Sequence, residues 1–214
     1  MSYGRCQMIA IVDYGVGNIT SLVNSLKHLS QRIVFTTDAQ LIESASVVIL
    51  PGVGKFDGAM RSIDENGLRE VLDHRFRTNR PIIGICLGMQ IMFESSDEAP
   101  GVSGLCWFKG RSRRLPDTMI VPHTGWNSVP MKDTLSATDY YFVHSYYVQL
   151  ADRNLISYNC TYSLPFPAYI EKDAVIGFQF HPEISGKDGI KLLETSIVKT
   201  KGVKNEKICS DRPV

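Results

Sequence analysis

The chain has 214 residues, of which 43% are hydrophobic and 21% charged, and its formal net charge is +1. This length and composition predict one globular domain with a sizeable core. The near-neutral charge argues against a nucleic-acid-binding protein, and no apolar run approaches the length of a membrane span.

The first hundred residues alternate between strand-like and helix-like segments. Short, solidly apolar runs predict strands over residues 8–15, 32–37, 46–52 and 81–85. Helical spacing predicts helices over residues 18–29 and 57–78, the second interrupted near Gly67, and a further helix from Leu87. Strands that are apolar on both faces and alternate with helices are typical of a parallel sheet covered by helices on both sides.

After about residue 100 the pattern becomes rich in short β-like runs. These runs predict strands over residues 103–109, 118–121, 140–150, 154–160, 167–172 and 175–180. A helix is expected at about 187–198, followed by a polar tail at 199–214. The sequence therefore predicts one α/β domain at 8–198, with a parallel sheet flanked by helices and a β-rich second half.

A cysteine between two glycines follows the fourth predicted strand. The sequence PIIGICLGMQ places Cys86 where that strand passes into a helix. This arrangement is a nucleophile elbow with cysteine in place of serine, which exposes the sulfur at the carboxyl edge of the sheet. The start of the following helix favours an anion there. The alternative is a small hydrophobic residue in a tight turn, but the flanking strand and amphipathic helix favour a nucleophile.

The other cysteines do not suggest a disulfide framework or a zinc site. The five are widely spaced, without a CxxC pair, at Cys6, Cys86, Cys106, Cys160 and Cys209. An odd number with this spacing favours a reducing compartment. The N-terminal sequence MSYGRCQ also lacks the apolar segment of a signal peptide. We therefore expect a cytoplasmic protein without a metal site.

A histidine and a carboxylate follow the last predicted strand, in the sequence FHPE. Pro182 ends the strand, so His181 is expected at the strand end rather than inside the sheet. Glu183 can reach back to one ring nitrogen and support an imidazolium. A polar turn is the alternative, but together with Cys86 the motif supplies a Cys-His-Glu triad.

Glycines also follow the third predicted strand, in the sequence LPGVGKF. Gly52 and Gly54 allow main-chain amides to point into the site. These amides and that of Leu87 would hold a developing oxyanion. A phosphate-binding loop is a poor alternative, because the segment contains no Gly-Lys-Ser/Thr sequence.

The sequences PGVGKF, GICLGMQ and FHPE together resemble the motifs of the class I, or triad, glutamine amidotransferases. VDYGVGN, PHTGWN and YYFVHSYY are similar to sequences of the glutaminase subunits of imidazole glycerol phosphate synthases, which belong to histidine biosynthesis. The resemblance extends over about residues 8–197. It implies a flavodoxin-like fold and a partner-dependent enzyme that hydrolyses glutamine to glutamate and ammonia without a cofactor.

The resemblance implies a role for each matching residue. Cys86 would attack the glutamine amide, His181 would move the protons and Glu183 would orient His181. The oxyanion would be held by the backbone amides of Val53 and Leu87. The positions that would contact glutamine are Gly52, Gly54, Gln90, His144 and Ser145. The positions assigned to a partner interface are Trp126, Asn127, Tyr141 and Ile184. Core packing is an equally good explanation for His123, Trp126, Asn127, Tyr141, His144 and Ser145.

A single glutaminase domain fills the chain, so the ammonia acceptor is expected on another chain. The resemblance implies a heterodimer with a (β/α)8-barrel, cyclase-like synthase subunit to which ammonia is channelled. A stand-alone hydrolase with the same elbow would not need PHTGWN or YFVHSYY. A catalytically inactive scaffold would not need an intact triad.

Three residues depart from the family pattern. Ile184 replaces the usual lysine after HPE, Thr124 replaces methionine in PHTGWN, and Lys55 replaces a small residue after PGVG. Ile184 matters most, because the family's lysine faces the synthase. The alternative function is therefore the paralogous amidotransferase subunit, which supplies ammonia for amination of a nucleotide-linked sugar in surface polysaccharide biosynthesis.

Overall fold

The computed structural model describes residues 8–15, 19–131, 137–151 and 154–202. The expected polar tail lies outside the described residues beyond Gly202. No helix within the described ranges is long and apolar enough to cross a membrane.

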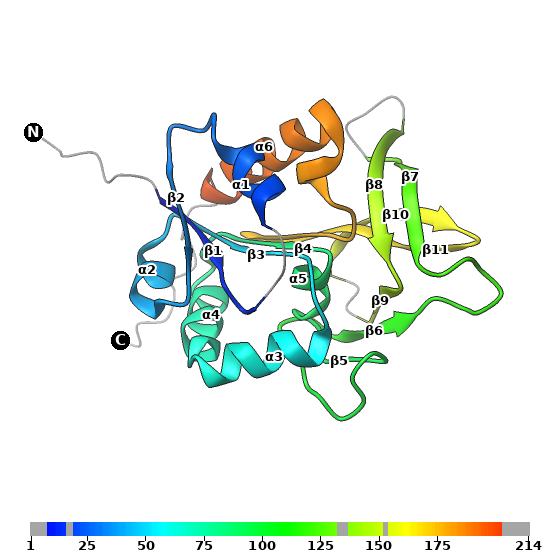
Figure 1. The fold of residues 1–214 in the computed structure, drawn as a ribbon, viewed down its shortest axis with the longest axis horizontal. Coiled ribbons are helices and arrows are strands. Elements are labelled where there is room, and N and C mark those ends of the chain that lie inside the picture. The colour runs from blue at the N-terminus through cyan, green and yellow to red at the C-terminus, as the bar shows by residue number, and fades with distance from the viewer. Residues whose placement is uncertain (1–7, 16–18, 132–136, 152–153, 203–214) are drawn as a thin grey trace, which may run out of the picture.

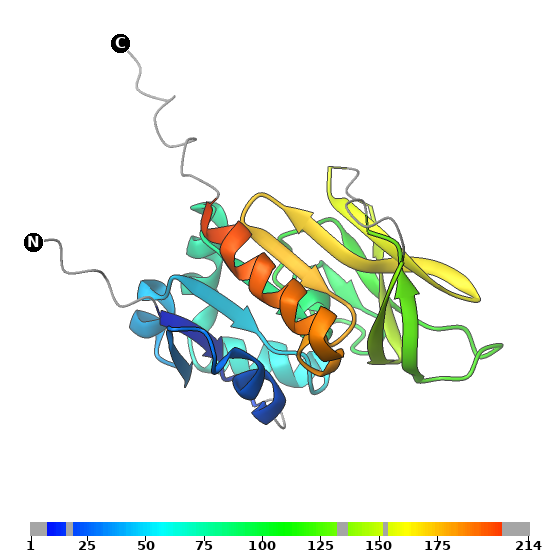
Figure 2. The ribbon, with the colours of Figure 1, turned by 90° about the horizontal axis from the view of Figure 1, so that it is seen from above.

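A seven-stranded sheet forms the centre of the molecule, in the order β10-β11-β12-β4-β3-β1-β2 (Figures 1 and 2). Five strands are mutually parallel: β1 (Met8–Val12), β2 (Arg32–Thr36), β3 (Val47–Leu50), β4 (Ile82–Ile85) and β12 (Val175–Phe178). Two antiparallel strands extend the sheet: β11 (Leu164–Lys172) and β10 (Ile156–Tyr162). The predicted α/β fold with a parallel first half is confirmed.

Helices cover both faces of the parallel strands (Figure 1). One face carries α1 (Thr20–Leu26) and α6 (Gly186–Gly202). The other carries α2 (Ala39–Ser44), α3 (Phe56–Glu65) and α4 (Leu68–Arg77). Along β1, Ile9 and Ile11 pack into the core below α1 and α6, whereas Ala10 and Val12 pack on the opposite side. Because both faces are buried, these strands read as continuous apolar runs.

The second half of the chain adds two small sheets. One contains β5 (Ser95–Ser96), β6 (Gly110–Arg114) and β9 (Tyr146–Leu150), and the other pairs β7 (His123–Val129) with β8 (Thr138–His144). The expected strand at 140–150 is therefore divided at Ser145 between two sheets. This division places the β8–β9 turn beside the carboxyl edge of the main sheet.

Two predicted strands are wrong. Residues 103–109 form a loop with one isolated bridge, and residues 118–121 form turns. The apolar side chains of residues 103–109 are buried because this loop packs against residues 91–94. There the amide of Leu105 bonds to the carbonyl of Ile91, and that of Trp107 to the carbonyl of Met92. Apolar content in this segment reflected burial rather than strand structure.

The interruption between α3 and α4 lies where the sequence predicts it, but the last helix extends further than predicted. Gly67 adopts a left-handed φ of 65° between α3 and α4, which confirms the predicted interruption. The last helix continues to Gly202, and Thr200 in its final turn is buried. The proposed domain boundary at residue 198 consequently falls inside α6.

Candidate active site

Three neighbouring strands bring the motif residues to one edge of the sheet. The register pairs Leu50 of β3 with Gly84 of β4, and Ile85 of β4 with Phe178 of β12. The chain then leaves β3 into the glycine loop, β4 into Cys86, and β12 towards His181. Because β3, β4 and β12 are adjacent, these three segments lie together at the carboxyl edge, where open α/β sheets place their sites.

Cys86 occupies a strained turn between β4 and α5 (Leu87–Gln90). Its backbone has φ 46° and ψ −104°, a conformation that residues with side chains rarely adopt. A Cβ atom added to Gly88 would lie 2.0 Å from the carbonyl oxygen of Leu50, so the close packing of α5 on β3 requires glycine there. The geometry is that of the expected elbow.

The helix after the elbow differs from the prediction. It spans only the four residues of α5, and all four are buried, so it is neither long nor amphipathic. A single turn carries little of the macrodipole of a long helix, because few peptide dipoles are aligned. Stabilisation of an anion at Cys86 must therefore come from individual hydrogen-bond donors around the sulfur.

His181 is held in one orientation at the end of β12. Its backbone amide donates to the carbonyl of Tyr141, 2.9 Å away, and its Nδ1 lies 2.8 Å from Oε1 of Glu183. Glu183 lies in the short 3-10 helix Pro182–Ile184. With Nδ1 bonded to Glu183, the remaining nitrogen, Nε2, is the one available for the hydrogen bond with Cys86.

The surroundings of His181 favour its protonated form. Burial alone lowers the pKa of this imidazole, but hydrogen bonds and charge interactions with Cys86 and Glu183 outweigh burial and raise the pKa above its ordinary value. Oε2 of Glu183 is buried without a hydrogen-bond partner among the described residues. The carboxylate charge is therefore compensated mainly by His181, which strengthens the preference for imidazolium.

The glycine loop after β3 closes over the amide of Leu87. The carbonyl oxygen of Gly52 accepts a hydrogen bond from the Leu87 amide at 3.4 Å. The hydroxyl of the buried Tyr14 donates to the carbonyl of Pro51 and anchors the start of the loop. In this conformation the Leu87 amide, which is one of the two amides expected to hold an oxyanion, is bonded to the glycine loop instead.

A cavity of about 310 Å³ opens beside Cys86 and His181. It collects every position expected to bind glutamine or its oxyanion: Gly52, Val53, Gly54, Leu87, Gln90, His144 and Ser145. Their roles stay predictions, but the structure places all of them around one cavity. The wall also contains backbone from the β8–β9 turn, including Val143 and Tyr146.

Sequence reasoning missed Glu98, which also lines this cavity. Its Oε2 accepts a hydrogen bond from the amide of Phe56 at 3.0 Å, which holds the partly buried carboxylate near the start of α3. Glu98 lies in a turn-rich segment after β5, without helical or strand periodicity. Only the tertiary packing of this segment against α3 reveals that a carboxylate faces the site.

The expected interface residues lie outside the cavity. The rings of Trp126 and Tyr141 meet edge to face with centroids 5.9 Å apart, and Trp126 is 58% exposed. Ile184 is 40% exposed beside the triad. Asn127 instead has a structural role, because its side-chain amide donates to the carbonyl of Thr161 and its oxygen accepts from the Ser128 amide.

A buried pair of histidines joins the cavity wall to the core behind it, with His144 in the wall and His123 behind it. Nδ1 of His123 is 3.0 Å from Nε2 of His144, and the His123 ring stacks on Tyr162 and Phe142. Burial lowers the pKa of His123 to about 4 and that of His144 to about 3. Both rings are consequently neutral at physiological pH, whereas the pKa of the neighbouring His181 is raised.

This pair should make the protein sensitive to acid. Above about pH 6.5 both rings are neutral whether folded or unfolded, so the stability is fully present. As the pH falls below that value, these two histidines bind protons in the unfolded chain but stay neutral in the folded chain. The free energy of unfolding should then fall by about 1.4 kcal/mol per pH unit for each histidine. This loss continues until the pH approaches the pKa that the histidine has in the folded protein. Urea unfolding between pH 7 and 5 measures this slope.

A His144→Gln variant provides the control for that titration. It keeps a donor and an acceptor but removes one titrating ring, so the slope between pH 6.5 and 5 should decrease by about 1.4 kcal/mol per pH unit. An unchanged slope in this variant would show that His144 does not stay neutral in the folded state.

The model of the class-I glutamine amidotransferase family matches residues 10–200. Curated relatives match over similar lengths. The imidazole glycerol phosphate synthase subunit HisH of Exiguobacterium sibiricum is 44% identical over 187 residues, covering 87% of this chain and 93% of that relative. The protein of the same name from Staphylococcus aureus is 41% identical over 190 residues, covering 89% of this chain and 96% of that relative.

Solved structures support the fold at much lower identity. A crystal structure described as a glutamine amidotransferase has a TM-score of 0.75 and 16% identity, covering 91% of this chain and 99% of that one. The structure of PurLQS from Thermotoga maritima has a TM-score of 0.68 and 16% identity, with coverage of 91% and 99%. The same arrangement of sheet and helices is therefore present in proteins of widely divergent sequence.

Proposed function

This chain belongs to the class-I glutamine amidotransferase family, and we propose that it is the glutaminase subunit of an imidazole glycerol phosphate synthase. In this role it hydrolyses glutamine and supplies the ammonia to a separate synthase subunit. The observation that carries the proposal is that Cys86 and His181 face one cavity and interact there, while Nδ1 of His181 lies 2.8 Å from Oε1 of Glu183. The similarity to HisH proteins over most of the chain supports the pathway.

The proposed reaction starts from a thiolate–imidazolium pair. The sulfur of Cys86 attacks the side-chain amide carbon of glutamine, and the carbonyl oxygen becomes an oxyanion. Nε2 of His181 gives its proton to the amide nitrogen, the carbon–nitrogen bond breaks, and ammonia leaves a glutamyl thioester on Cys86. His181 then takes a proton from a water molecule that attacks the thioester, which releases glutamate and restores the pair. Glu183 orients the imidazole throughout.

Glutamine also needs partners for its charged end. We assign the carboxylate of Glu98 to the α-ammonium group, because it is an acidic side chain in the cavity wall and is held in place by the Phe56 amide. Polar backbone from Ser145 and the glycine loop is available for the rest of the substrate.

The glycine loop provides a means of control. The carbonyl of Gly52 occupies the Leu87 amide in the isolated chain, so an oxyanion would lack that donor. Rotation of the peptide unit between Gly52 and Val53 would free the Leu87 amide and direct the Val53 amide into the site. Loss of one oxyanion donor costs about 100- to 1,000-fold in rate. The chain alone is therefore proposed to be weakly active.

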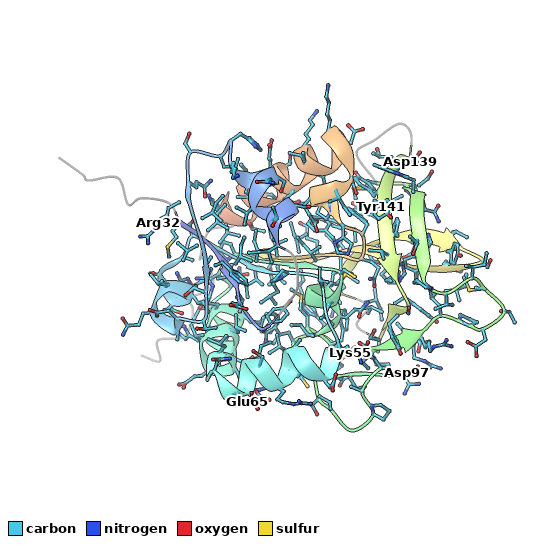
Figure 3. All side chains as sticks on the ribbon, in the orientation of Figure 1. Arg32, Lys55, Glu65, Asp97, Asp139 and Tyr141 are labelled. Atoms are coloured by element: carbon cyan, nitrogen blue, oxygen red, sulfur yellow. The ribbon has the colours of Figure 1, made fainter. Side chains whose placement is uncertain are left out.

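An exposed apolar surface surrounds the cavity mouth and supplies a site for the partner. Val53 and Val143 line the cavity, although each is more than 40% exposed. Trp126 lies 4.0 Å from the position a Cβ would take on Gly186, which begins α6 two residues after Ile184. Tyr141 lies on β8 next to the start of α6 (Figure 3). Tyr141 is half-buried, but the exposed Val53, Trp126, Val143 and Ile184 are typical of an interface.

We propose that a (β/α)8-barrel, cyclase-like synthase subunit binds this surface as a heterodimer. Because Val53 belongs to both the surface and the glycine loop, binding there would act directly on the loop. The covered cavity mouth would direct ammonia into the synthase. A cytoplasmic location is proposed with this role, consistent with the unpaired thiols of Cys86, Cys106 and Cys160.

The alternative function, amination of a nucleotide-linked sugar, is not favoured. It rested on Ile184 in place of a lysine, whereas the relatives at 41–44% identity carry the name of the histidine-pathway enzyme. One substituted interface position is compatible with the same partner.

Mixing the purified chain with the cyclase subunit tests this proposal. We expect a 1:1 complex and at least a 100-fold increase in glutamate release when the acceptor substrate is present. Trp126→Ala should weaken the complex about 10- to 100-fold, because an exposed aromatic anchor is lost. Ile184→Lys should preserve binding and stimulation, since lysine is the usual family residue.

Calorimetry and a coupled glutamate assay measure both properties. A complex that is lost in Ile184→Lys but retained in Trp126→Ala would favour a partner with an apolar patch at residue 184, as in the sugar-amination alternative. No complex with the native chain would contradict the proposed function.

A further inference from the structure

Gln179 contacts the sulfur of Cys86 but has no part in the triad mechanism. It follows β12, two residues before His181, and its side chain has no solvent exposure. Its side-chain Nε2 lies 3.6 Å from Sγ of Cys86, within hydrogen-bonding range for sulfur. The identity of the atom facing the sulfur is decisive, since the amide nitrogen favours a thiolate and the amide oxygen would repel one.

A single backbone carbonyl fixes the orientation of this amide. The carbonyl oxygen of Tyr146 can only accept hydrogen bonds, so the atom of Gln90 that lies 2.8 Å from it must be Nε2. That same Nε2 lies 3.2 Å from the Gln179 side chain, which must therefore present its Oε1. With Oε1 directed at Gln90, the NH2 group of Gln179 is left facing Cys86.

The same carbonyl also fixes the histidine pair. Nδ1 of His144 lies 2.9 Å from the Tyr146 oxygen and must be protonated, so Nε2 of the neutral ring accepts a hydrogen bond from Nδ1 of His123. Both lone-pair positions of the Tyr146 oxygen are thereby engaged. An inverted Gln90 amide would set its oxygen against this carbonyl, so the orientation of Gln179 is stabilised through two buried neighbours.

We propose that Gln179 is a catalytic residue that donates a hydrogen bond to the Cys86 sulfur and stabilises its thiolate form. The proposal rests on the proposed function, because it assumes that Cys86 is the nucleophile. Hydrogen bonds to charged groups are stronger than those to neutral groups, so the donor favours the thiolate over the thiol. The carbonyl of Val143, 3.9 Å from the sulfur, is an acceptor and would favour the thiol. Gln179 counteracts it.

Several titratable groups surround Cys86 and must be included in any test. His181 approaches from the end of β12, His144 from the end of β8, and Glu98 from the loop after β5. Tyr14, after β1, lies close enough for the Cys86 charge to add to burial in raising its pKa. Gln179→Met leaves the charge of each of these groups in place, whereas Gln179→Glu adds a further carboxylate next to Cys86, so the methionine variant gives the simpler comparison.

Two substitutions remove the donor in different ways. Gln179→Met keeps the length and removes the amide, whereas Gln179→Glu keeps the shape and replaces the NH2 group with a carboxyl oxygen. Matched controls are Gln40→Met and Gln40→Glu, because Gln40 is exposed in the first turn of α2. The rate of alkylation of Cys86 by iodoacetamide is measured from pH 6 to 9 by mass spectrometry of its peptide. The exposed Cys106 peptide serves as an internal standard.

At pH 7 we expect about 10-fold slower alkylation of Cys86 in Gln179→Met, and a larger loss in Gln179→Glu. The difference from the native chain should close as the pH rises, because alkaline solution restores the thiolate. With the synthase bound, kcat for glutamine should fall in parallel and KM should change little. Both Gln40 variants should match the native chain.

Two results would overturn the assignment. An unchanged pH profile in both Gln179 variants would show that no donor acts on the sulfur. An equal loss at every pH would show that Gln179 only supports the local fold. If Cys86→Ala itself retained glutaminase activity, the proposed function would be wrong. If Cys86→Ala has no glutaminase activity but both Gln179 variants show the native pH profile of alkylation, this inference alone is overturned.

Discussion

Cys86→Ala should abolish glutamine-dependent synthesis, with a loss on the order of a million-fold, as for the nucleophile of other triads. The expectation follows from the elbow, which presents the Cys86 sulfur to His181 at the cavity wall. Alanine fits the strained turn no worse than cysteine does, so the fold should be retained. Synthesis driven by added ammonium should continue, because the acceptor site lies on the partner.

The comparison variant for this experiment is Cys160→Ala. Cys160 is also buried, and burial raises the pKa of its thiol to about 12, so it is a poor nucleophile. This variant should retain glutaminase activity. A chloroketone analogue of glutamine should label Cys86 and leave Cys106 and Cys160 unmodified. Glutamate release by Cys86→Ala at more than a trace rate would disprove the assignment.

His181→Ala should lower the glutaminase rate about 100- to 10,000-fold, and Glu183→Gln should have a smaller effect. The imidazole carries a proton to the departing ammonia, whereas Glu183 orients the ring and supports its charge through the 2.8 Å contact. Glutamine at residue 183 can still accept a hydrogen bond from Nδ1, but it no longer raises the pKa of His181 by its charge.

Steady-state rates for both variants, measured with the synthase bound, decide this point. Binding of the partner should be checked first, because His181 and Glu183 lie next to the exposed Ile184. Equal and small losses for the two variants would show that FHPE is a structural turn without a role in proton transfer.

The sequence predicted the parallel sheet and the elbow because both depend on local patterns. Strands buried on both faces read as unbroken apolar runs, as in β3 and β4. The glycines around Cys86 reflect a turn that side chains would obstruct, as the position of Gly88 shows. Residues 103–109 were assigned wrongly because a loop buried against residues 91–94 has the same apolar content as a strand.

The residues missed at the site depend on contacts between distant segments. Glu98 reaches the cavity only because the turn after β5 packs on the start of α3. The orientation of Gln179 is set by the carbonyl of Tyr146, a backbone atom on another strand. A backbone oxygen has no signature in the sequence, so neither role is visible before the chain is folded.

Transfer of the glutamine amide nitrogen to the synthase product is the most direct test of the proposed role. The native chain is combined with the cyclase subunit, its acceptor, glutamine labelled with ¹⁵N in the side-chain amide, and equimolar unlabelled ammonium. Mass spectrometry should find most of the imidazole glycerol phosphate labelled, and only unlabelled product with Cys86→Ala. Unlabelled product from the native chain, with glutamine left intact, would contradict a glutaminase that feeds this synthase.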